Sequence, residues 1–98
     1  MIDRDAFLEA VRSGREPEGA GEALRVLWLL RCRGWDAAHD VAQEMPDPDG
    51  AWLHAHLHRV EGDLGNAGYW YRRAGRPVAQ GDLGEEWTAM VEHFVAEA

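Results

Sequence analysis

The chain has 98 residues, with 10 basic and 18 acidic side chains and a formal net charge of −8. This length suits one domain with one core. The negative charge argues against nucleic-acid binding, because phosphate contacts need a basic surface. A single cysteine, Cys32, excludes an internal disulfide. Without a signal-peptide pattern or a long apolar run, we expect a cytoplasmic protein that does not enter a membrane.

Glycine and proline breaks divide the chain into segments of helical length, so we expect an all-α fold of about six helices. The first helix follows Asp3, a suitable cap, and runs to about Val11. The second covers about Gly21 to Arg33 and is apolar on nearly every side, which predicts a central position. Gly34 ends it, and the third helix covers about Trp35 to Met45.

The fourth helix is predicted to start at Pro48, with Asp47 as its cap, and to reach about Glu61. The fifth covers about Leu64 to Ala74. The sixth follows Asp82, which has capping-box spacing to Glu85. The predicted architecture is a single all-α domain over residues 1–98, with helical hairpins at about 21–45 and 48–75 and a C-terminal helix at about 83–97.

Residues 61–77, EGDLGNAGYWYRRAGRP, resemble the turn and second helix of a tetratricopeptide repeat. In that motif a Gly-Asp turn precedes small and aromatic residues at set intervals and then a proline. The matching residues are Gly62, Asp63, Ala67, Tyr71, Ala74 and Pro77. The first hairpin fits more loosely, through Gly34, Ala38, Ala42 and Met45. The resemblance implies two degenerate helical hairpins, and the string from Trp52 to Gly75 is also similar to small bacterial proteins of unassigned function.

Three of the five histidines lie in the sequence HAHLH, at positions 54 to 58. The alternation imitates a strand, but the neighbouring apolar residues have helical spacing. On a helix, His54, His58 and Glu61 share one side, whereas His56 lies with Trp52. The repeat resemblance implies that His54 and His58 face the partner helix of the hairpin, partly buried.

Two interpretations of the histidine pair remain open. In the first, the imidazoles belong to a buried polar network, because buried polar groups are normally hydrogen-bonded. In the second, two imidazoles at positions i and i+4 bind a divalent metal. The residues available to either arrangement are His39, His54, His58, Glu61 and Asn66, and Tyr71 is a further possible hydrogen-bond partner.

Signatures of catalysis are missing, so no residue is assigned a catalytic role. The pair His54 and His58 lacks the glutamate of HExxH, and the chain has no GxSxG, GxGxxG or P-loop pattern. The sequence therefore favours a protein that is not an enzyme and needs no cofactor. A small metal-binding protein or enzyme that uses His54 and His58 stays as the alternative.

Binding of a protein or peptide is the function that we expect, because stacked hairpins expose a groove and aromatic and arginine side chains are common interface anchors. The candidate binding residues are Trp52, His56, Arg59, Tyr69, Arg72, Arg73 and Arg76. Alternatively, Arg72 and Arg73 only solvate the surface or pair with the acidic C-terminal segment. Since two repeats make a small stack, a homodimer is also possible.

Overall fold

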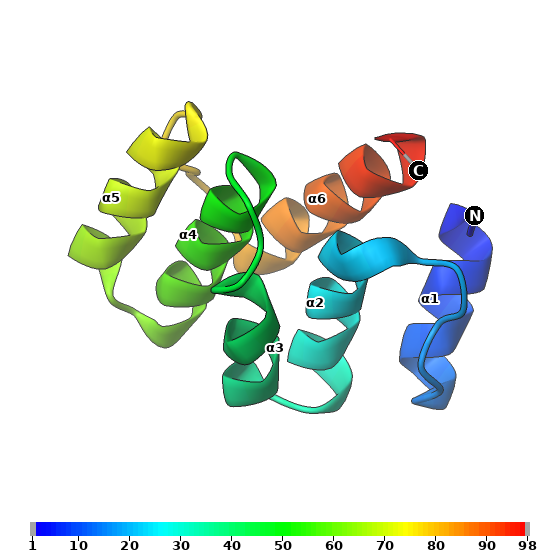
Figure 1. Cartoon of the computed structure of the whole chain (residues 1–98). Helices are drawn as coiled ribbons and strands as arrows, with labels where there is room; N and C mark the ends of the chain where they lie inside the picture. The colour runs from blue at the N-terminus through cyan, green and yellow to red at the C-terminus, as the bar shows by residue number, and fades with distance from the viewer. Residues whose placement is uncertain (1, 98) are drawn as a thin grey trace.

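The computed structural model describes residues 2–97, and within this range the chain is all-α, with six helices and no strand. Figure 1 shows them as a row of helices with α1 and α5 at opposite ends. Their bounds are α1 Arg4–Ser13, α2 Gly21–Cys32, α3 Trp35–Ala42, α4 Asp49–Glu61, α5 Leu64–Ala74 and α6 Leu83–Glu97. None of these helices is long and apolar enough to cross a membrane.

Most helix starts follow the local signals in the sequence. The Asp3 carboxylate accepts a hydrogen bond from the Ala6 amide at 2.8 Å, and Asp82 accepts one from the Gly84 amide at 2.8 Å. The third helix ends at Ala42, so the predicted end at Met45 is wrong. The residue before a proline disfavours helical backbone angles, and Pro46 follows Met45.

The predicted cap of α4 is also wrong. Pro48 occupies the N-cap position without a side-chain hydrogen bond. The Asp47 carboxylate instead accepts a hydrogen bond from Arg73 Nη2 at 2.6 Å. A long-range ion pair between the start of α4 and the end of α5 has therefore replaced the local cap, which sequence spacing could not reveal.

The helices pair into two hairpins, α2 with α3 and α4 with α5, which are joined by packing of α3 against α4. The last helix, α6, packs against α1, α2 and α4. In contrast, the backbone of α5 lies close to that of α4 alone among the helices of the described chain, and α5 reaches α6 through the Tyr71 side chain. The centre of the molecule thus lies at α2 and α4, and α5 forms one end of the row (Figure 1).

A shared apolar core extends through all six helices. At its centre, Leu24, Leu27 and Trp28 of α2 are each 1% exposed. The Trp28 indole donates a hydrogen bond to the Ala10 carbonyl at 3.0 Å, and the Trp87 indole donates one to the Leu27 carbonyl at 3.1 Å. The large aromatic residues therefore pack the core and also tie α1 and α6 to α2.

The turn between α4 and α5 has the mechanics that its sequence implies. Gly62 ends α4 with a left-handed φ of 88°, a conformation that favours glycine. The Asp63 side chain then accepts a hydrogen bond from the Asn66 amide. Ala67 and Tyr71 are buried against α4.

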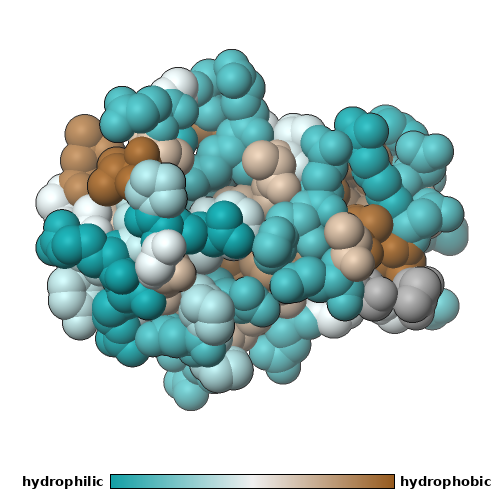
Figure 2. All heavy atoms as spheres, turned by 90° about the horizontal axis from the view of Figure 1, so that it is seen from above, coloured by the Kyte–Doolittle hydropathy of each residue, from teal (hydrophilic) through white to brown (hydrophobic). Residues whose placement is uncertain are grey.

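In the space-filling view from above, hydrophobic areas are small and separated by hydrophilic surface (Figure 2).

Candidate functional site

Helix α4 carries the densest group of buried polar side chains. Every residue from Gly50 to His58 is buried, because α2, α3, α5 and α6 all pack around this helix. The three histidines are included: His54 is 8% exposed, His56 1% and His58 7%. Since His56 projects from a different side of the helix, it has partners of its own.

The first group is a histidine cluster, which we define as His39, His54 and His58. His39 comes from α3, and the other two come from successive turns of α4. The Nε2 atoms of His39 and His54 are 2.9 Å apart. Each of the three residues has a ring nitrogen that lies within 4.8 Å of a ring nitrogen of both other residues. The cluster thus joins the first hairpin to the second through side chains that can all bind a ligand.

Glu61 and Asn66 surround the third histidine. Glu61 Oε1 lies 2.7 Å from His58 Nδ1, and Asn66 Nδ2 lies 3.5 Å from His58 Nε2. A proton on Nδ1, donated to the carboxylate, leaves the Nε2 lone pair directed away from Glu61. All five residues predicted for a polar network or metal site are therefore in contact, directly or through one neighbour.

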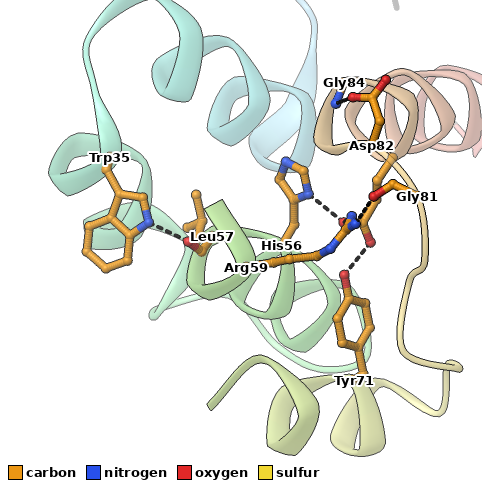
Figure 3. Close-up of polar contacts among 9 residues, drawn as sticks. Trp35, His56, Leu57, Arg59, Tyr71, Gly81, Asp82 and Gly84 are labelled. Carbon is orange, nitrogen blue, oxygen red and sulfur yellow. Dashed lines mark hydrogen bonds and ion pairs between the residues drawn. The ribbon is translucent and has the colours of Figure 1, made fainter. Parts of the chain in front are cut away.

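Two tryptophans fix the rings of the histidine cluster. Trp70 of α5 stacks on His54, with ring centroids 4.0 Å apart and planes at 6°. Trp35 stacks on His39 at 4.7 Å and 12°, and its indole donates a hydrogen bond to the Leu57 carbonyl at 2.6 Å (Figure 3). Because both indoles are held by packing or hydrogen bonds, the imidazoles have little freedom to rotate.

The electrostatics of the histidine cluster keep His54 neutral. Burial first, and then the nearby His39, His58 and Arg73, together lower the pKa of His54 to about 4 against the opposing effect of Asp47. The imidazole therefore has a free lone pair at neutral pH. A neutral nitrogen is what a hydrogen-bond acceptor or a metal ligand requires.

The low pKa of His54 predicts a loss of stability in mild acid. In the unfolded chain the imidazole takes up a proton near pH 6.5, whereas in the folded protein it stays neutral down to about pH 4. The unfolded state thus binds more protons between these values, and stability falls as the pH is lowered through this window, by up to about 3 kcal/mol.

Urea unfolding followed by tryptophan fluorescence at pH 7.5 and pH 4.5, in EDTA, measures this loss. The variant His54→Phe keeps a ring against Trp70 and should lose clearly less stability over the same interval. Equal losses in the two proteins would contradict the assignment to His54.

The second group centres on Glu86 of α6, which is 9% exposed. His56 Nδ1 lies 2.7 Å from Glu86 Oε1, and Arg59 Nη1 donates to the same oxygen at 3.1 Å. The Tyr71 hydroxyl donates to Oε2. Figure 3 shows the side chains of His56, Arg59 and Tyr71 pointing to one place from α4 and α5. Arg59 also donates to the Gly81 carbonyl.

The Glu86 group is a closed structural network. Burial alone would raise the pKa of Glu86, but the hydrogen bonds from His56, Tyr71 and Arg59, together with the charge of His56, lower the net pKa below its usual value. Burial and the hydrogen bond to Glu86 raise the pKa of Tyr71. The carboxylate is therefore ionised and its two oxygens are already engaged. Such an arrangement anchors α6 to the second hairpin.

The seven candidate binding residues do not form one surface. Trp52 is 7% exposed and lies under the Arg76 guanidinium, 3.4 Å from the ring centroid. His56 and Arg59 belong to the Glu86 network and are taken out of the expected groove. Three candidates stay exposed, namely Tyr69, Arg72 and Arg73. The expected pairing of Arg72 and Arg73 with the acidic C-terminal segment does not form among the described residues, because Arg73 pairs with Asp47, and it is Arg59 that pairs with Glu86.

Two features of this region were not predicted from the sequence: the Glu86 network, and the stacking of Trp35 and Trp70 on the histidine rings. A signal for the first exists, because Glu86, Met90 and Phe94 follow one another at intervals of four and lie on the apolar side of α6. A charged residue on such a stripe needs a buried partner. For the second, nothing in the local sequence around Trp70 shows that it stacks on His54.

Comparisons of the chain with protein-family models, with curated proteins and with solved structures found no match. The resemblance to tetratricopeptide repeats therefore stays a prediction. The chemistry that bears on function lies in the two polar groups on α4 and on the exposed surface of α5.

Proposed function

We propose that the protein is an interaction module that binds an acidic segment of a partner protein on the outer side of α5. The observation that carries this proposal is the position of α5, whose backbone lies close to that of α4 alone among the described helices, while Tyr71 on its inner side reaches Glu86 of α6. Its opposite side is open to a partner, as at the end of a stack of helical repeats.

The exposed side chains of α5 suit a partner with both apolar and acidic groups. Leu64 is 68% exposed and Tyr69 is 46% exposed. At about 100° per residue, Tyr69 and Arg72 share the outer side of the helix, whereas Leu64 lies at the start of the side that carries Ala67 and Tyr71. On that neighbouring side, a groove of about 430 Å³ lies between α5, Arg59 of α4 and the loop at 78–81; Leu64 lines it, and so does Val78, which is 48% exposed. Exposed apolar residues next to an arginine are typical of interface anchors.

Charge favours an acidic partner. Arg59 and Arg73 are already paired with Glu86 and Asp47, whereas Arg72 is exposed and Arg76 lies over the Trp52 ring. Helix α5 itself contains no acidic residue. The outer side of α5 therefore presents the positive charge of Arg72, to which an acidic segment is attracted.

A displayed library of random peptides tests this proposal. Peptides selected on the protein should be rich in Asp and Glu next to Leu or aromatic residues. Their affinity should fall about tenfold or more for Arg72→Glu, because the change replaces an attraction by a repulsion. Arg15→Glu makes the same charge change in the loop before α2 and serves as the control.

Equal binding to Arg72→Glu and to the unchanged protein would contradict the proposed surface. Sedimentation of the protein without peptide is measured in parallel. A dimer that Arg72→Glu dissociates would show that the acidic partner is a second copy of the chain rather than another protein.

A further inference from the structure

The histidine cluster has a use that the interaction surface does not require. Its three imidazoles come from two hairpins, and one nitrogen of each lies within 4.8 Å of the others. From this convergence we infer that His39, His54 and His58 bind one divalent transition-metal cation, of which Zn²⁺ is the representative.

The separation of the nitrogens is close to what one metal ion needs. Zn–N bonds of about 2.0–2.1 Å in a tetrahedral site place two nitrogens about 3.3 Å apart. The Nε2 atoms of His39 and His54 are 2.9 Å apart, so an outward movement of a few tenths of an ångström makes room. Without metal, one of the two rings donates the proton on its Nε2 atom to the other ring. When a metal binds, that proton moves to the Nδ1 atom of the same ring, so that both Nε2 lone pairs are free to bind the metal.

Glu61 supplies the support that metal-binding histidines usually have. Its carboxylate accepts the proton on His58 Nδ1 across 2.7 Å, which leaves Nε2 as the ligand atom. This carboxylate–histidine contact fixes the tautomer and increases the basicity of the ligand. The Nε2 atom has only the distant Asn66 amide beside it, at 3.5 Å, so binding a metal breaks no strong hydrogen bond there.

Stacking on two tryptophans reduces the conformational entropy that the imidazoles lose when a metal binds. Trp70 lies parallel to His54 and Trp35 lies parallel to His39. The imidazoles are thus oriented before a metal arrives. His39 is half-buried, so the cluster is reached from solvent on the α3 side.

The donors decide which cations fit. Three neutral imidazoles suit Zn²⁺, Co²⁺, Ni²⁺ or Cu²⁺, whereas Mg²⁺ and Ca²⁺ prefer oxygen ligands. A three-histidine set leaves a fourth position for water or an external donor. Because Glu61 is already engaged by His58, we assign binding rather than hydrolysis to this site.

Two other groups in the described chain resemble metal sites less closely. Asp49, His93 and Glu97 form one, but it has a single imidazole and an exposed carboxylate. His58, Glu61 and Asp63 form the other, which shares His58 with the cluster and otherwise offers exposed acids. Exposed acidic groups are common without a metal, so His93 provides a matched control rather than a rival proposal.

Titration calorimetry of protein purified without a histidine tag and stripped of metal tests the inference. With zinc chloride at pH 7.5 we expect one equivalent bound, and a rise in the melting temperature, because a ligand that binds only the folded state stabilises it. Magnesium chloride should give neither effect. Cobalt chloride should give the visible absorption of a cobalt ion with nitrogen ligands.

Variants separate a metal site from packing. Changing a supporting carboxylate costs about 10–100-fold in metal affinity, so Glu61→Gln should weaken zinc binding by about tenfold or more. The variant His54→Phe keeps an aromatic ring against Trp70 but removes one metal ligand. The variant His39→Ala removes a second ligand at a position that is only half-buried. Each should weaken binding at least about 100-fold, since a ligand contributes more than its support. His93→Gln should bind zinc like the unchanged protein.

The inference is overturned if the unchanged, folded protein binds no zinc at a concentration of about 100 µM, which is high enough to detect a weak site. In that case the cluster is hydrogen-bonded packing only. It is equally overturned if His93→Gln abolishes binding while His54→Phe and His39→Ala retain it. Circular dichroism of each variant shows that it is folded before its affinity is compared.

Discussion

Replacing Glu86 by alanine should lower the free energy of unfolding by about 3–5 kcal/mol, the usual cost of removing one partner from a buried ion pair. The change leaves the Arg59 cation without its carboxylate. It also removes the acceptor from His56 and from the Tyr71 hydroxyl. A domain of this size has only about 5–15 kcal/mol of net stability, so the variant should be close to unfolding.

Urea unfolding measures this loss, with Glu85→Ala as the control. Glu85 precedes Glu86 on α6 but is exposed, so its removal should change stability by about 0.5 kcal/mol or less. The variant Glu86→Gln keeps one hydrogen-bond acceptor and removes the charge, and should fall between the two. If Glu86→Ala and Glu85→Ala unfold at the same urea concentration, the Glu86 network does not anchor α6.

The second large effect is expected at Gly50, where the two hairpins meet. A Cβ atom added at this position would lie 2.4 Å from the Met45 carbonyl oxygen and 2.9 Å from its carbon. Both are backbone atoms, so the link between α3 and α4 must shift. Overpacking of this kind costs about 1–3 kcal/mol and occasionally more, and we expect Gly50→Ala to lie at or above the upper end.

Gly65→Ala provides the matched control for Gly50. It lies in α5 with no atom within 4 Å of the added Cβ, and alanine is the better helix former. This variant should be as stable as the unchanged protein or more stable by about 0.5–1 kcal/mol. Thermal unfolding compares the two, and equal melting temperatures would contradict the close approach at Met45.

The sequence predicted the helices well because their signals are local. Helical spacing of apolar residues and the glycine breaks placed all six, and α5 has the predicted ends Leu64 and Ala74. The failures lie at the link between the hairpins. There α3 ends before Met45, which precedes Pro46, and Asp47 binds Arg73 instead of capping α4. The first is a local effect that the helical spacing did not include, whereas the second is a contact between helices that local sequence does not show.

The histidine cluster could be predicted in part. The i, i+4 spacing put His54 and His58 on one side of a helix, and the hairpin resemblance placed that side inward. His39, Glu61 and Asn66 followed as possible neighbours. The 2.9-Å approach of His39 to His54 could not be predicted, because it depends on how closely α3 and α4 pack.

The prediction that His56 is a binding residue is wrong, because its contacts come from a helix later in the chain. Its position next to Trp52 suggested a place in an exposed groove. The packing of α6, some thirty residues later, instead covers it and brings Glu86 to its Nδ1 atom. The spacing of Glu86, Met90 and Phe94 indicates that Glu86 is buried, but which residue it meets is set by the tertiary fold.

The histidines of α4 have two roles: His56 belongs to the structural Glu86 network, and we infer that His54 and His58 join His39 in a metal site. Anomalous diffraction at the zinc edge, from crystals of the zinc-loaded protein, distinguishes these roles. One peak is expected about 2.0–2.1 Å from a nitrogen of each of His39, His54 and His58, with His56 still bound to Glu86. A peak at His93, or none in crystals where His39 and His54 stay hydrogen-bonded, would contradict the inference.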